Sequence, residues 1–201
     1  FTAFLHHHWV GGAIWAGLVM TDVKGRIIMS SLQGFRTRIQ PPEPADEEAF
    51  LAAMRDSAGL HHPWVSAPKD PAGWKRYMKR LERVNEAGFL VKRIRDGAIC
   101  GVINLNVITY EALCSAYVSY FGVEGLVERG YMKEGMLQVI RYAFDELGLH
   151  RLEANIQPGN LASISLAKST GFEYEGYSPR LLKIRGEWRD HERWAVISDS
   201  D

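Results

Sequence analysis

The sequence predicts an α/β (α+β) fold in which one mixed β-sheet carries helices on its faces. The length of 201 residues is near that of a single domain and suffices to bury a sizeable core. Hydrophobic residues make up 46% of the chain and charged residues 24%, which is ordinary for a globular protein. Strand-like and helix-like segments follow one another in the order β-α-α-β-β-β-α-β-α-β-β, which favours one sheet covered by helices.

The first half of the chain is predicted to contribute three strands and two helices. Its first strand alternates apolar and basic residues, as a strand with one buried face does. Prolines then stop that strand, and acidic residues open a helix whose apolar residues share one face. Gly88 ends the second helix, and Asp96-Gly97 indicates a type I′ hairpin between the next two strands. The predicted elements are a strand at 35–39, a helix at 45–54, a loop at 59–68, a helix at 71–87, and strands at 89–95 and 98–107.

The second half alternates strands and helices more regularly. A stripe of apolar residues that includes Met136 and Phe144 predicts a long helix, which Gly148 ends. Asn160 suits the N-cap of a further helix, which Gly171 closes. The predicted elements are a strand at 113–123, a helix that follows a glycine turn and lasts to about 147, a strand at 151–157, a helix at 161–170, and paired strands at 172–184 and 187–197.

The stretch from Val127 to Met136 organises the rest, because it joins a strand to the long helix through a glycine turn. The first amides of a helix have no intrahelical acceptor, and the aligned peptide dipoles add partial positive charge there. Gly130 lets backbone approach a bulky phosphate, and Arg129 and Lys133 supply full charges close by. The segment therefore predicts an anion site, although a solvated helix start has the same pattern.

Charge and cysteine content narrow the class of protein. The formal net charge is +0, so no long-range basic field argues for a nucleic-acid partner, and any anion binding must be local. Cys100 and Cys114 lie in strand-like apolar segments, which favours reduced core thiols over a disulfide or a metal pair. We therefore expect a cytoplasmic protein, monomer or homodimer, with no metal site and no membrane partner.

The N-terminal residues differ from the rest of the chain. Residues 9–20 are apolar, but the run is too short to span a bilayer, and no basic region precedes it as in a secretory signal. We expect residues 1–31 to form an N-terminal extension that is either derived from cloning or poorly ordered. The folded domain is expected at 32–198.

Five linked segments carry a resemblance to a known family. They are H-P-W at 62–64, V-E-R-G-Y-M-K-E at 127–134, H-R-L-E-A-N-I-Q-P-G-N-L-A-S at 150–163, S-T-G-F-E-Y-E-G-Y at 169–177 and I-R-G-E-W-R-D-H-E at 184–192. Together they resemble the GNAT superfamily of acyl-CoA-dependent N-acyltransferases, and most of all its RimJ/RimL type, which acetylates N-terminal amines of ribosomal proteins. The resemblance implies a mostly antiparallel sheet of about seven strands, with a V-shaped splay between two parallel strands.

The resemblance also implies a site for acetyl-CoA. In the family, the pyrophosphate lies on a loop of pattern Gln/Arg-x-x-Gly-x-Gly/Ala, which Val127, Gly130 and Met132 match here. Only Gly130 keeps the pattern, so the loop has lost a polar contact but keeps its amides, and a degenerate loop is the alternative. The splayed strand would expose backbone groups to the pantetheine arm and an amide to the thioester oxygen. The cofactor-binding residues implied are Phe121, Gly122, Val123, Glu128, Arg129, Gly130, Tyr131, Met132, Lys133, Asn160 and Ser163.

Two catalytic candidates follow from the same resemblance. Asn160 and Ser163 match an N-x-x-S motif, in which Ser163 would protonate the leaving thiolate; a simple capping role is the alternative. Many relatives carry Glu on the strand before the phosphate loop, and the matching residue here is Tyr117, which is not a base at neutral pH. Other candidates for the base are a water chain, Glu111, Glu124 and Glu153, among which the spacing does not choose.

The acceptor that the resemblance implies is a protein N-terminal α-amine. Its pKa is about 7.7–8.0, against about 10.4 for Lys, so it asks little of a general base. His62, Trp64 and Tyr120 are predicted to wall the acceptor pocket, with core packing as the alternative for Trp64. Two other functions stay open: acetylation of a small amine such as an aminoglycoside, a polyamine or an amino acid, and CoA binding without turnover.

Overall fold

The computed structural model describes residues 20–21, 27–28 and 35–198, and the chain divides into two compact units, Phe1–Ser30 and Ser31–Asp201. In the first unit, β1 (Met20–Thr21) pairs antiparallel with β2 (Ile27–Ile28). The rest of the extension expected at 1–31 lies outside the described residues. The second unit contains the main sheet and all the described helices.

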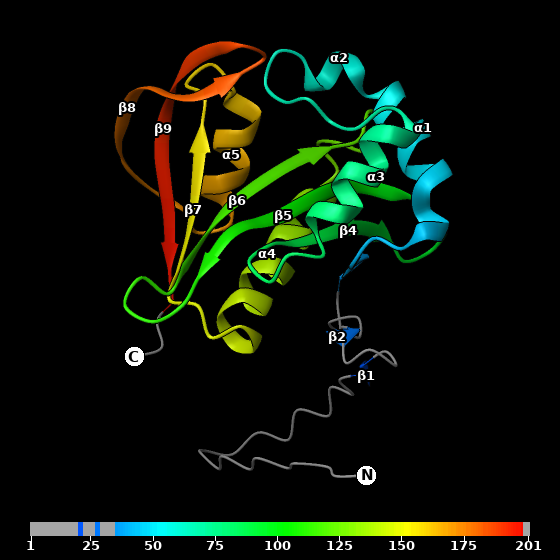
Figure 1. The fold of residues 1–201 in the computed structure, drawn as a ribbon, viewed down its shortest axis with the longest axis horizontal. Coiled ribbons are helices and arrows are strands. Elements are labelled where there is room, and N and C mark those ends of the chain that lie inside the picture. Colours follow the sequence, from blue (N-terminus) through cyan, green and yellow to red (C-terminus); the bar gives the residue numbers. More distant parts are fainter. Residues whose placement is uncertain (1–19, 22–26, 29–34, 199–201) are drawn as a thin grey trace. The chain divides into compact units, whose positions relative to one another are not determined.

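A seven-stranded sheet with the order β3-β4-β5-β6-β7-β9-β8 forms the centre of the second unit (Figure 1). Every neighbouring pair is antiparallel except β6 and β7, which are parallel. The predicted mixed, mostly antiparallel sheet is thereby confirmed. Its strands are β3 (Thr37–Gln40), β4 (Ala87–Arg93), β5 (Ile99–Thr109), β6 (Ser115–Gly122), β7 (Arg151–Ile156), β8 (Glu173–Ile184) and β9 (Glu187–Ile197).

Helices cover both faces of this sheet (Figure 1). Alternation along β4 separates the two faces, because Leu90 joins the core beneath α1 and α3, whereas Val91 packs against Gly135 of α4. We call them the α3 face and the α4 face. The helices are η1 (Pro44–Asp46), α1 (Glu47–Asp56), α2 (Ala58–His61), α3 (Pro71–Arg80), α4 (Tyr131–Arg141), the π-helix η2 (Tyr142–Glu146) and α5 (Leu161–Ser169).

An aromatic cluster anchors α1 and α3 to the α3 face. The ring centroid of Phe50 lies 4.7 Å from that of Trp74 and 5.7 Å from that of Tyr77. Phe50 is fully buried, so truncation to Ala would cost about 3–5 kcal/mol. This packing holds α3 at a set distance above the strands, which leaves room for a cavity beside it.

The helices of the first half differ from the prediction, and α1 covers Glu47–Asp56 where a helix at 45–54 was expected. The loop expected at 59–68 begins with the single turn of α2 (Ala58–His61), whose apolar signal is too short to see in the sequence. The second helix ends at Arg80 instead of 87. Val84, which extended the apolar stripe, is 96% exposed, so its spacing matches a helix face that has no core to pack against.

The predicted type I′ hairpin is also wrong. Gly97 has φ +73°, but Asp96 does not have the positive φ that this turn needs at both central residues. The Asp96 carboxylate instead accepts hydrogen bonds from the guanidinium of Arg93 at 2.9 and 2.7 Å and from the amide of Ala98 at 3.2 Å. A side-chain network therefore closes a wider connection between β4 and β5.

The parallel strands β6 and β7 pair only where they begin. Ser115–Tyr117 align with Arg151–Glu153, after which β6 continues to Gly122 and β7 to Ile156 without a partner between them. Figure 1 shows the two strands moving apart beyond this point. The predicted V-shaped splay is confirmed, and it leaves one backbone edge of each strand unpaired in the middle of the sheet.

Candidate active site

The turn after β6 presents free backbone amides at the start of α4. Gly130 is the N-cap, with φ +82°, and no side chain caps the helix. The first helical bond runs from the amide of Glu134 to the carbonyl of Gly130 at 3.0 Å. Within the described part of the chain, no acceptor is bonded to the amides of Arg129–Lys133. Such orphan donors at a positive helix end suit a phosphate group.

The two departures from the family loop have a packing explanation. A Cβ at Gly122 would lie 2.6 Å from Val127 Cγ1, and a Cβ at Gly101 would overlap Met132 Sδ. Val127 and Met132 therefore fill the space that two strand glycines leave, and they hold the turn tightly against β5 and β6. Their apolar side chains serve this contact, while the backbone amides of the turn stay available.

Arg36, just before β3, braces the same turn, and sequence reasoning missed it. Its Nη2 donates to the carbonyl of Arg129 at 2.9 Å, and its Nε donates to Glu134 Oε1 at 2.7 Å. Its backbone amide also donates to Glu134 Oε2 at 2.8 Å, and its guanidinium lies 4.8 Å from the ring centroid of Tyr131. The alternating pattern at 35–39 indicated a strand but not that one of its basic residues reaches the phosphate turn.

The register of β5 and β6 turns backbone groups into the splay. The amide of Val123 donates to the carbonyl of Cys100 at 3.0 Å, which makes Gly101 and Gly122 a non-hydrogen-bonded pair. The backbone groups of Gly122 and Tyr120 consequently point away from β5, toward the side on which β7 diverges. Val123 was predicted to bind the cofactor, but its amide is used inside the protein and its side chain is buried.

His61 holds the end of β6 in place. Its Nε2 lies 2.8 Å from the carbonyl of Gly122, and its ring packs edge-on against Phe121 at 5.2 Å. Burial lowers the pKa of His61, so the ring is neutral and Nε2 carries the proton that it donates. The neighbouring His62 was predicted to wall the acceptor pocket, but it is exposed and lines neither of the cavities described below.

Ser163 and Asn160 lie together at the start of α5. The Asn160 side chain accepts from the amide of Ser163 at 3.2 Å, so Asn160 is an N-cap as predicted. The Ser163 hydroxyl makes no hydrogen bond to any residue that the structure describes, which leaves it able to donate. The Ser163 hydroxyl is therefore available for a catalytic role, which substitution by Ala can test.

Tyr120 was predicted to wall the acceptor pocket, and its side chain lies on the α4 face of the sheet. Its hydroxyl donates to the carbonyl of Ser163 at 2.8 Å, which joins β6 to α5 across the splay on the α4 face. Burial raises the pKa of Tyr120, so the phenol stays protonated. Tyr120 therefore does not line the cavity on the α3 face that is described below.

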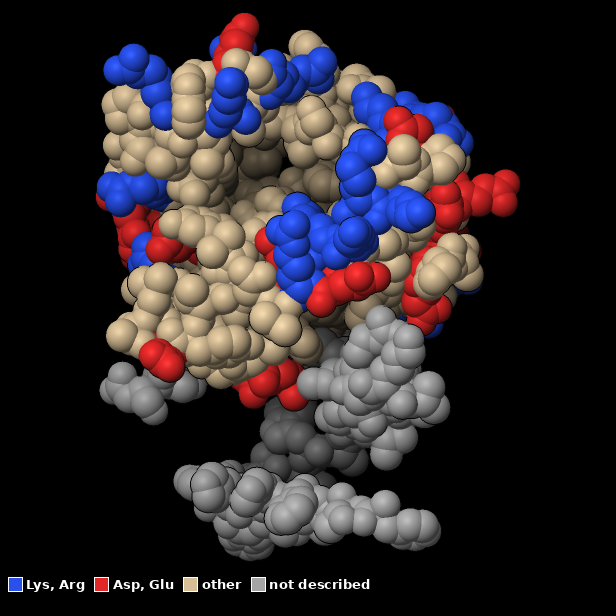
Figure 2. Space-filling view, viewed as in Figure 1, with Lys and Arg blue, Asp and Glu red and all other residues tan. Residues whose placement is uncertain are grey.

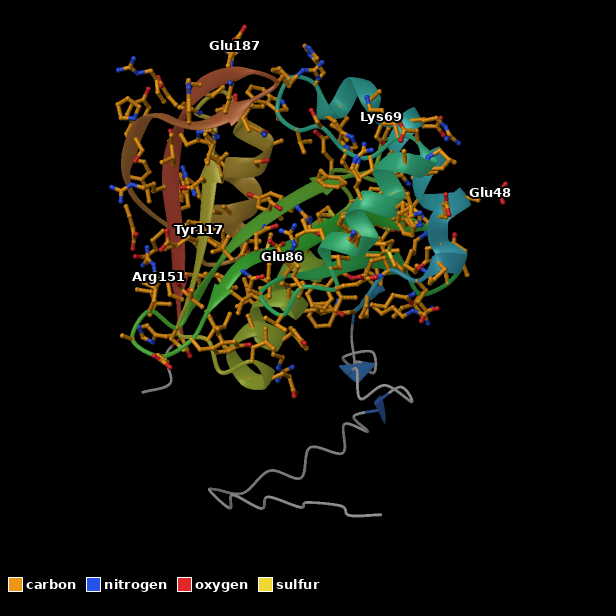
Figure 3. All side chains as sticks on the ribbon, viewed as in Figure 1. Glu48, Lys69, Glu86, Tyr117, Arg151 and Glu187 are labelled. Atoms are coloured by element: carbon orange, nitrogen blue, oxygen red, sulfur yellow. The ribbon has the colours of Figure 1, made fainter. Side chains whose placement is uncertain are left out.

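Tyr117 lies in a row across the α3 face, between Asn106 of β5 and Glu153 of β7. Figure 3 shows Tyr117 beside Arg151 at the end where β6 and β7 are still adjacent. Glu153 Oε1 accepts from Arg151 Nε at 2.9 Å, so this carboxylate is already paired. Of the other candidates for a base, Glu111 is exposed in the turn before β6, and Glu124 is exposed after it.

A cavity of about 570 Å³ lies on the α3 face, between the loop before α3, α3 itself and the sheet. Ser119 and Phe121 form part of its floor, in the part of β6 that no longer pairs with β7. Figure 2 shows the molecule hollowed on this face, with Lys and Arg side chains gathered beside the hollow over α3. Sequence reasoning missed this cavity, because Asn104 and Ser119 on its floor are brought together only by strand register.

Trp64 lines a second, smaller cavity of about 270 Å³, together with Gly159 and Trp188. Its carbonyl accepts from Gln157 Nε2 at 3.3 Å, and a Cβ at Gly159 would lie 3.1 Å from its ring. Trp64 thus joins the loop after α2 to the turn between β7 and α5. Trp64, which was predicted to wall the acceptor pocket, is half-buried by these contacts near the open end of the splay.

Comparison with known proteins identifies the family. A model of the acetyltransferase (GNAT) domain matches residues 36–173. The chain belongs to the GNAT acetyltransferases. It is 36% identical to a probable N-acetyltransferase, YjcK, of Bacillus subtilis, over 85% of this chain and 98% of that one. It is 30% identical to the ribosomal protein uS5 alanine N-acetyltransferase of Escherichia coli, over 76% of this chain and 84% of that one.

The GNAT fold also occurs in a solved spermidine N-acetyltransferase of Vibrio cholerae in complex with CoA and spermine. Its TM-score is 0.68 at 18% identity, over 81% of this chain and 95% of that one. Membership of the GNAT family makes the protein an acyltransferase with acetyl-CoA as cosubstrate. The residues present fit that group, because unbonded amides with nearby cations suit a diphosphate and the free backbone edge of β6 suits an amide-bearing arm.

No described helix is long and apolar enough to cross a membrane. Among the described residues, no three His, Cys, Asp or Glu side chains gather as a metal site would require.

Proposed function

We propose that this GNAT enzyme acetylates the α-amine of a protein N-terminus. The observation that carries the proposal is the lack of a free carboxylate at the usual place for a base. Tyr117 occupies the strand position, and Glu153, its neighbour on β7, is paired with Arg151. At pH 7 about 10–20% of an α-amine is neutral, against about 0.04% of a Lys side chain, so an N-terminal acceptor fits a site without a strong base.

The phosphate turn and β6 would hold the cosubstrate. The amides of Arg129–Lys133 bind the diphosphate, and the exposed side chains of Arg129 and Lys133 add charge. The backbone groups of Tyr120 that point away from β5 hydrogen-bond the pantetheine arm. The amide of Gly122, whose carbonyl His61 already holds, stabilises the negative charge that develops on the thioester oxygen. Acetyl-CoA supplies the activated acetyl group.

Ser163 would donate the proton that the leaving thiolate requires. The neutral amine nitrogen forms the new C–N bond as the C–S bond breaks, and it then loses one proton to water. The Ser163 hydroxyl gives a proton to the thiolate and regains one from solvent. Its unbonded state supports this role, as does the support of its helix turn by Asn160 and Tyr120.

The proposal is tested by following thiol release with acetyl-CoA and a panel of amines. The panel has three acceptors. The first is a peptide with a free N-terminus, the second is that peptide with a formylated N-terminus and a Lys inside its sequence, and the third is spermidine. We expect acetylation of the free α-amine, seen by mass spectrometry, with kcat/KM at least about tenfold above the other two. Acetylation of spermidine in preference to the free peptide would assign a polyamine acceptor instead.

A further inference from the structure

The Ser119 hydroxyl on the floor of the cavity on the α3 face offers a hydrogen-bond donor. Asn104 Nδ2 donates to Ser119 Oγ at 3.4 Å, and Asn106 Nδ2 donates to the same oxygen at 3.1 Å. Asn104 is itself held, because its Oδ1 accepts from the hydroxyl of Tyr77 at 2.9 Å. Since Ser119 Oγ already accepts two hydrogen bonds, its proton is directed to a third group, and Ser119 is exposed to the cavity.

The rim of this cavity carries an excess of positive charge. Lys69, Arg76 and Arg80 line it, against one acidic residue, Asp70. The Asp70 carboxylate is committed to the α3 N-cap, where Oδ1 accepts from the amide of Gly73 at 2.6 Å. Figure 3 shows Lys69 on the loop that leads into α3. The cavity wall is therefore cationic, although the net charge of the whole chain is +0.

Two of the three cations form no ion pair within the part of the chain that the structure describes. Arg80 lies 3.6 Å from Glu86, whose side chain is 9% exposed, and this pair is partly neutralised. Lys69 and Arg76 form no ion pair with any residue that the structure describes. Even with Glu86 counted, the wall keeps a positive charge, and that charge has no counterion within the described residues.

We propose that this cavity selects amine acceptors that carry a carboxylate close to the reacting amine. The inference rests on the proposed function and names its substrate class, which is a protein N-terminus followed by acidic residues. The amine lies at the splay, while the carboxylate accepts from Ser119 and pairs with Arg76 and Lys69. Arg76 suits this contact, because its planar guanidinium can donate two parallel hydrogen bonds to one carboxylate.

The same charges disfavour a polyamine. Each further ammonium group of such an acceptor would meet Lys69 and Arg76 with like charge, in a partly enclosed space where Coulomb energies exceed those in open water. This chain shares its fold with the spermidine enzyme, but the cationic wall of its cavity would repel a polycation.

The test compares three peptides of one length that begin with the same residue and continue with Glu-Glu, Gln-Gln or Lys-Lys. We expect kcat/KM to fall in that order, with at least about a tenfold span between the acidic and basic peptides at low salt. Raising the ionic strength should compress the span, because exposed charges are screened. A free amino acid tested in parallel shows whether a lone α-carboxylate suffices. If the free amino acid has a higher kcat/KM than the acidic peptide, the acceptor is a small amino acid and not a protein N-terminus.

Variants assign the preference to the cavity. Arg76→Gln should reduce the acidic-to-basic ratio at least about threefold, and Arg76→Glu should invert it. Lys75→Gln, an equal charge change on the same helix outside the cavity lining, should leave the ratio unchanged. Equal rates for all three peptides in the parent enzyme would overturn the charge selection while leaving N-terminal acetylation intact. No α-amine product from any peptide would instead overturn the proposed function.

Discussion

Gly130 combines two properties that a residue with a side chain cannot combine. Its φ of +82° strains any L-residue, and a Cβ there would lie 3.0 Å from Arg36 Nη2, at the point where the helix amides are free. The turn thus sets the backbone conformation at this residue, and the free amides beside it are where we propose that the diphosphate binds. Substitutions at Gly130 consequently report on strain and on binding together, and the two must be separated.

Gly130→Asp should weaken CoA binding by at least about tenfold, or about 1.4 kcal/mol, because a carboxylate would face the diphosphate. Isothermal titration with CoA measures the loss. Gly186→Asp is the control, since Gly186 has φ +88° and open space around it, in the connection between β8 and β9. Both variants should lose similar thermal stability. A CoA affinity for Gly130→Asp equal to that of the control would remove the phosphate site from this turn.

Ser163→Ala should lower kcat at least about tenfold while CoA affinity changes less than about twofold. The helix turn should survive, because the cap bond uses the Ser163 amide and the Asn160 side chain, not the hydroxyl. Pre-steady-state thiol release and CoA titration separate the two effects. A drop in affinity that matches the drop in kcat would leave Ser163 a structural residue of α5.

Residues near one another in the sequence were the ones that sequence reasoning could place. The glycine turn with Arg129 and Lys133, and the Asn160 cap, follow from local chemistry that leaves a mark in the sequence. Ser119 could not be found in this way. Its role depends on Asn104, 15 residues earlier, and on a strand register that no local pattern records. Tyr120 was predicted to wall the acceptor pocket, and no local pattern along β6 shows that its hydroxyl reaches the carbonyl of Ser163.

At the scale of elements, β3 and α4 are joined by one compact network around Glu134. Arg36 reaches Glu134 and the carbonyl of Arg129, while Gln138 bonds the carbonyl of Thr37 at 3.1 Å and accepts from the amide of Ile39 at 3.3 Å. An edge strand thereby holds the first turns of α4, the helix at whose start we propose that the diphosphate binds. The conformation of the turn before α4 therefore depends on the position of β3.

Arg36→Gln should weaken CoA binding several-fold while costing only about 1 kcal/mol or less of stability. The small stability cost follows from exposure, since the Arg36 side chain is 56% exposed and solvent screens its pair with Glu134. Arg38→Gln is the matched control, because Arg38 lies two residues later, on β3, and is exposed; it should change neither property. CoA titration and denaturant unfolding of both variants give the two numbers. An unchanged affinity in Arg36→Gln would show that the turn keeps its shape without the brace.

Long periodic elements were predictable from the sequence, and short or terminal ones were not. The strands β7, β8 and β9 and the helix α5 agree with prediction within one residue at each end, because turn and cap residues bound them. The turn of α2 was missed, since four residues cannot show a helical period. The α3 boundary was misplaced because Val84 keeps the spacing of the stripe while the backbone has already left the helix.

At the scale of the whole molecule, two buried histidines make stability depend on pH. Burial lowers the pKa of His61 and of His191 below the ordinary 6.5. The unfolded chain therefore takes up protons at a higher pH than the folded one. The stabilisation is complete above pH 6.5 and is lost as the pH falls from there through the folded-state pKa values, at up to about 1.4 kcal/mol per pH unit for each histidine.

Urea unfolding at a series of pH values between about 7.5 and 5 should show this decline. His191→Gln should flatten the slope, because it removes one of the two groups. The matched control is His62→Gln, whose side chain is exposed and should leave the slope as it is. A parent enzyme whose unfolding free energy is constant over this range would contradict the assignment of both histidines.

The splay between β6 and β7 gives the sheet two separately accessible sides at one point. The phosphate turn and its glycine contacts lie on the α4 face, while the cationic cavity lies on the α3 face. Acetyl-CoA and the amine substrate would then reach the reacting atoms from opposite sides of the sheet, and neither would block the release of the other's product. A bisubstrate inhibitor must in that case be threaded through the sheet, with a narrow linker no bulkier than an extended thioether where the strands part and its two recognition groups placed on either side.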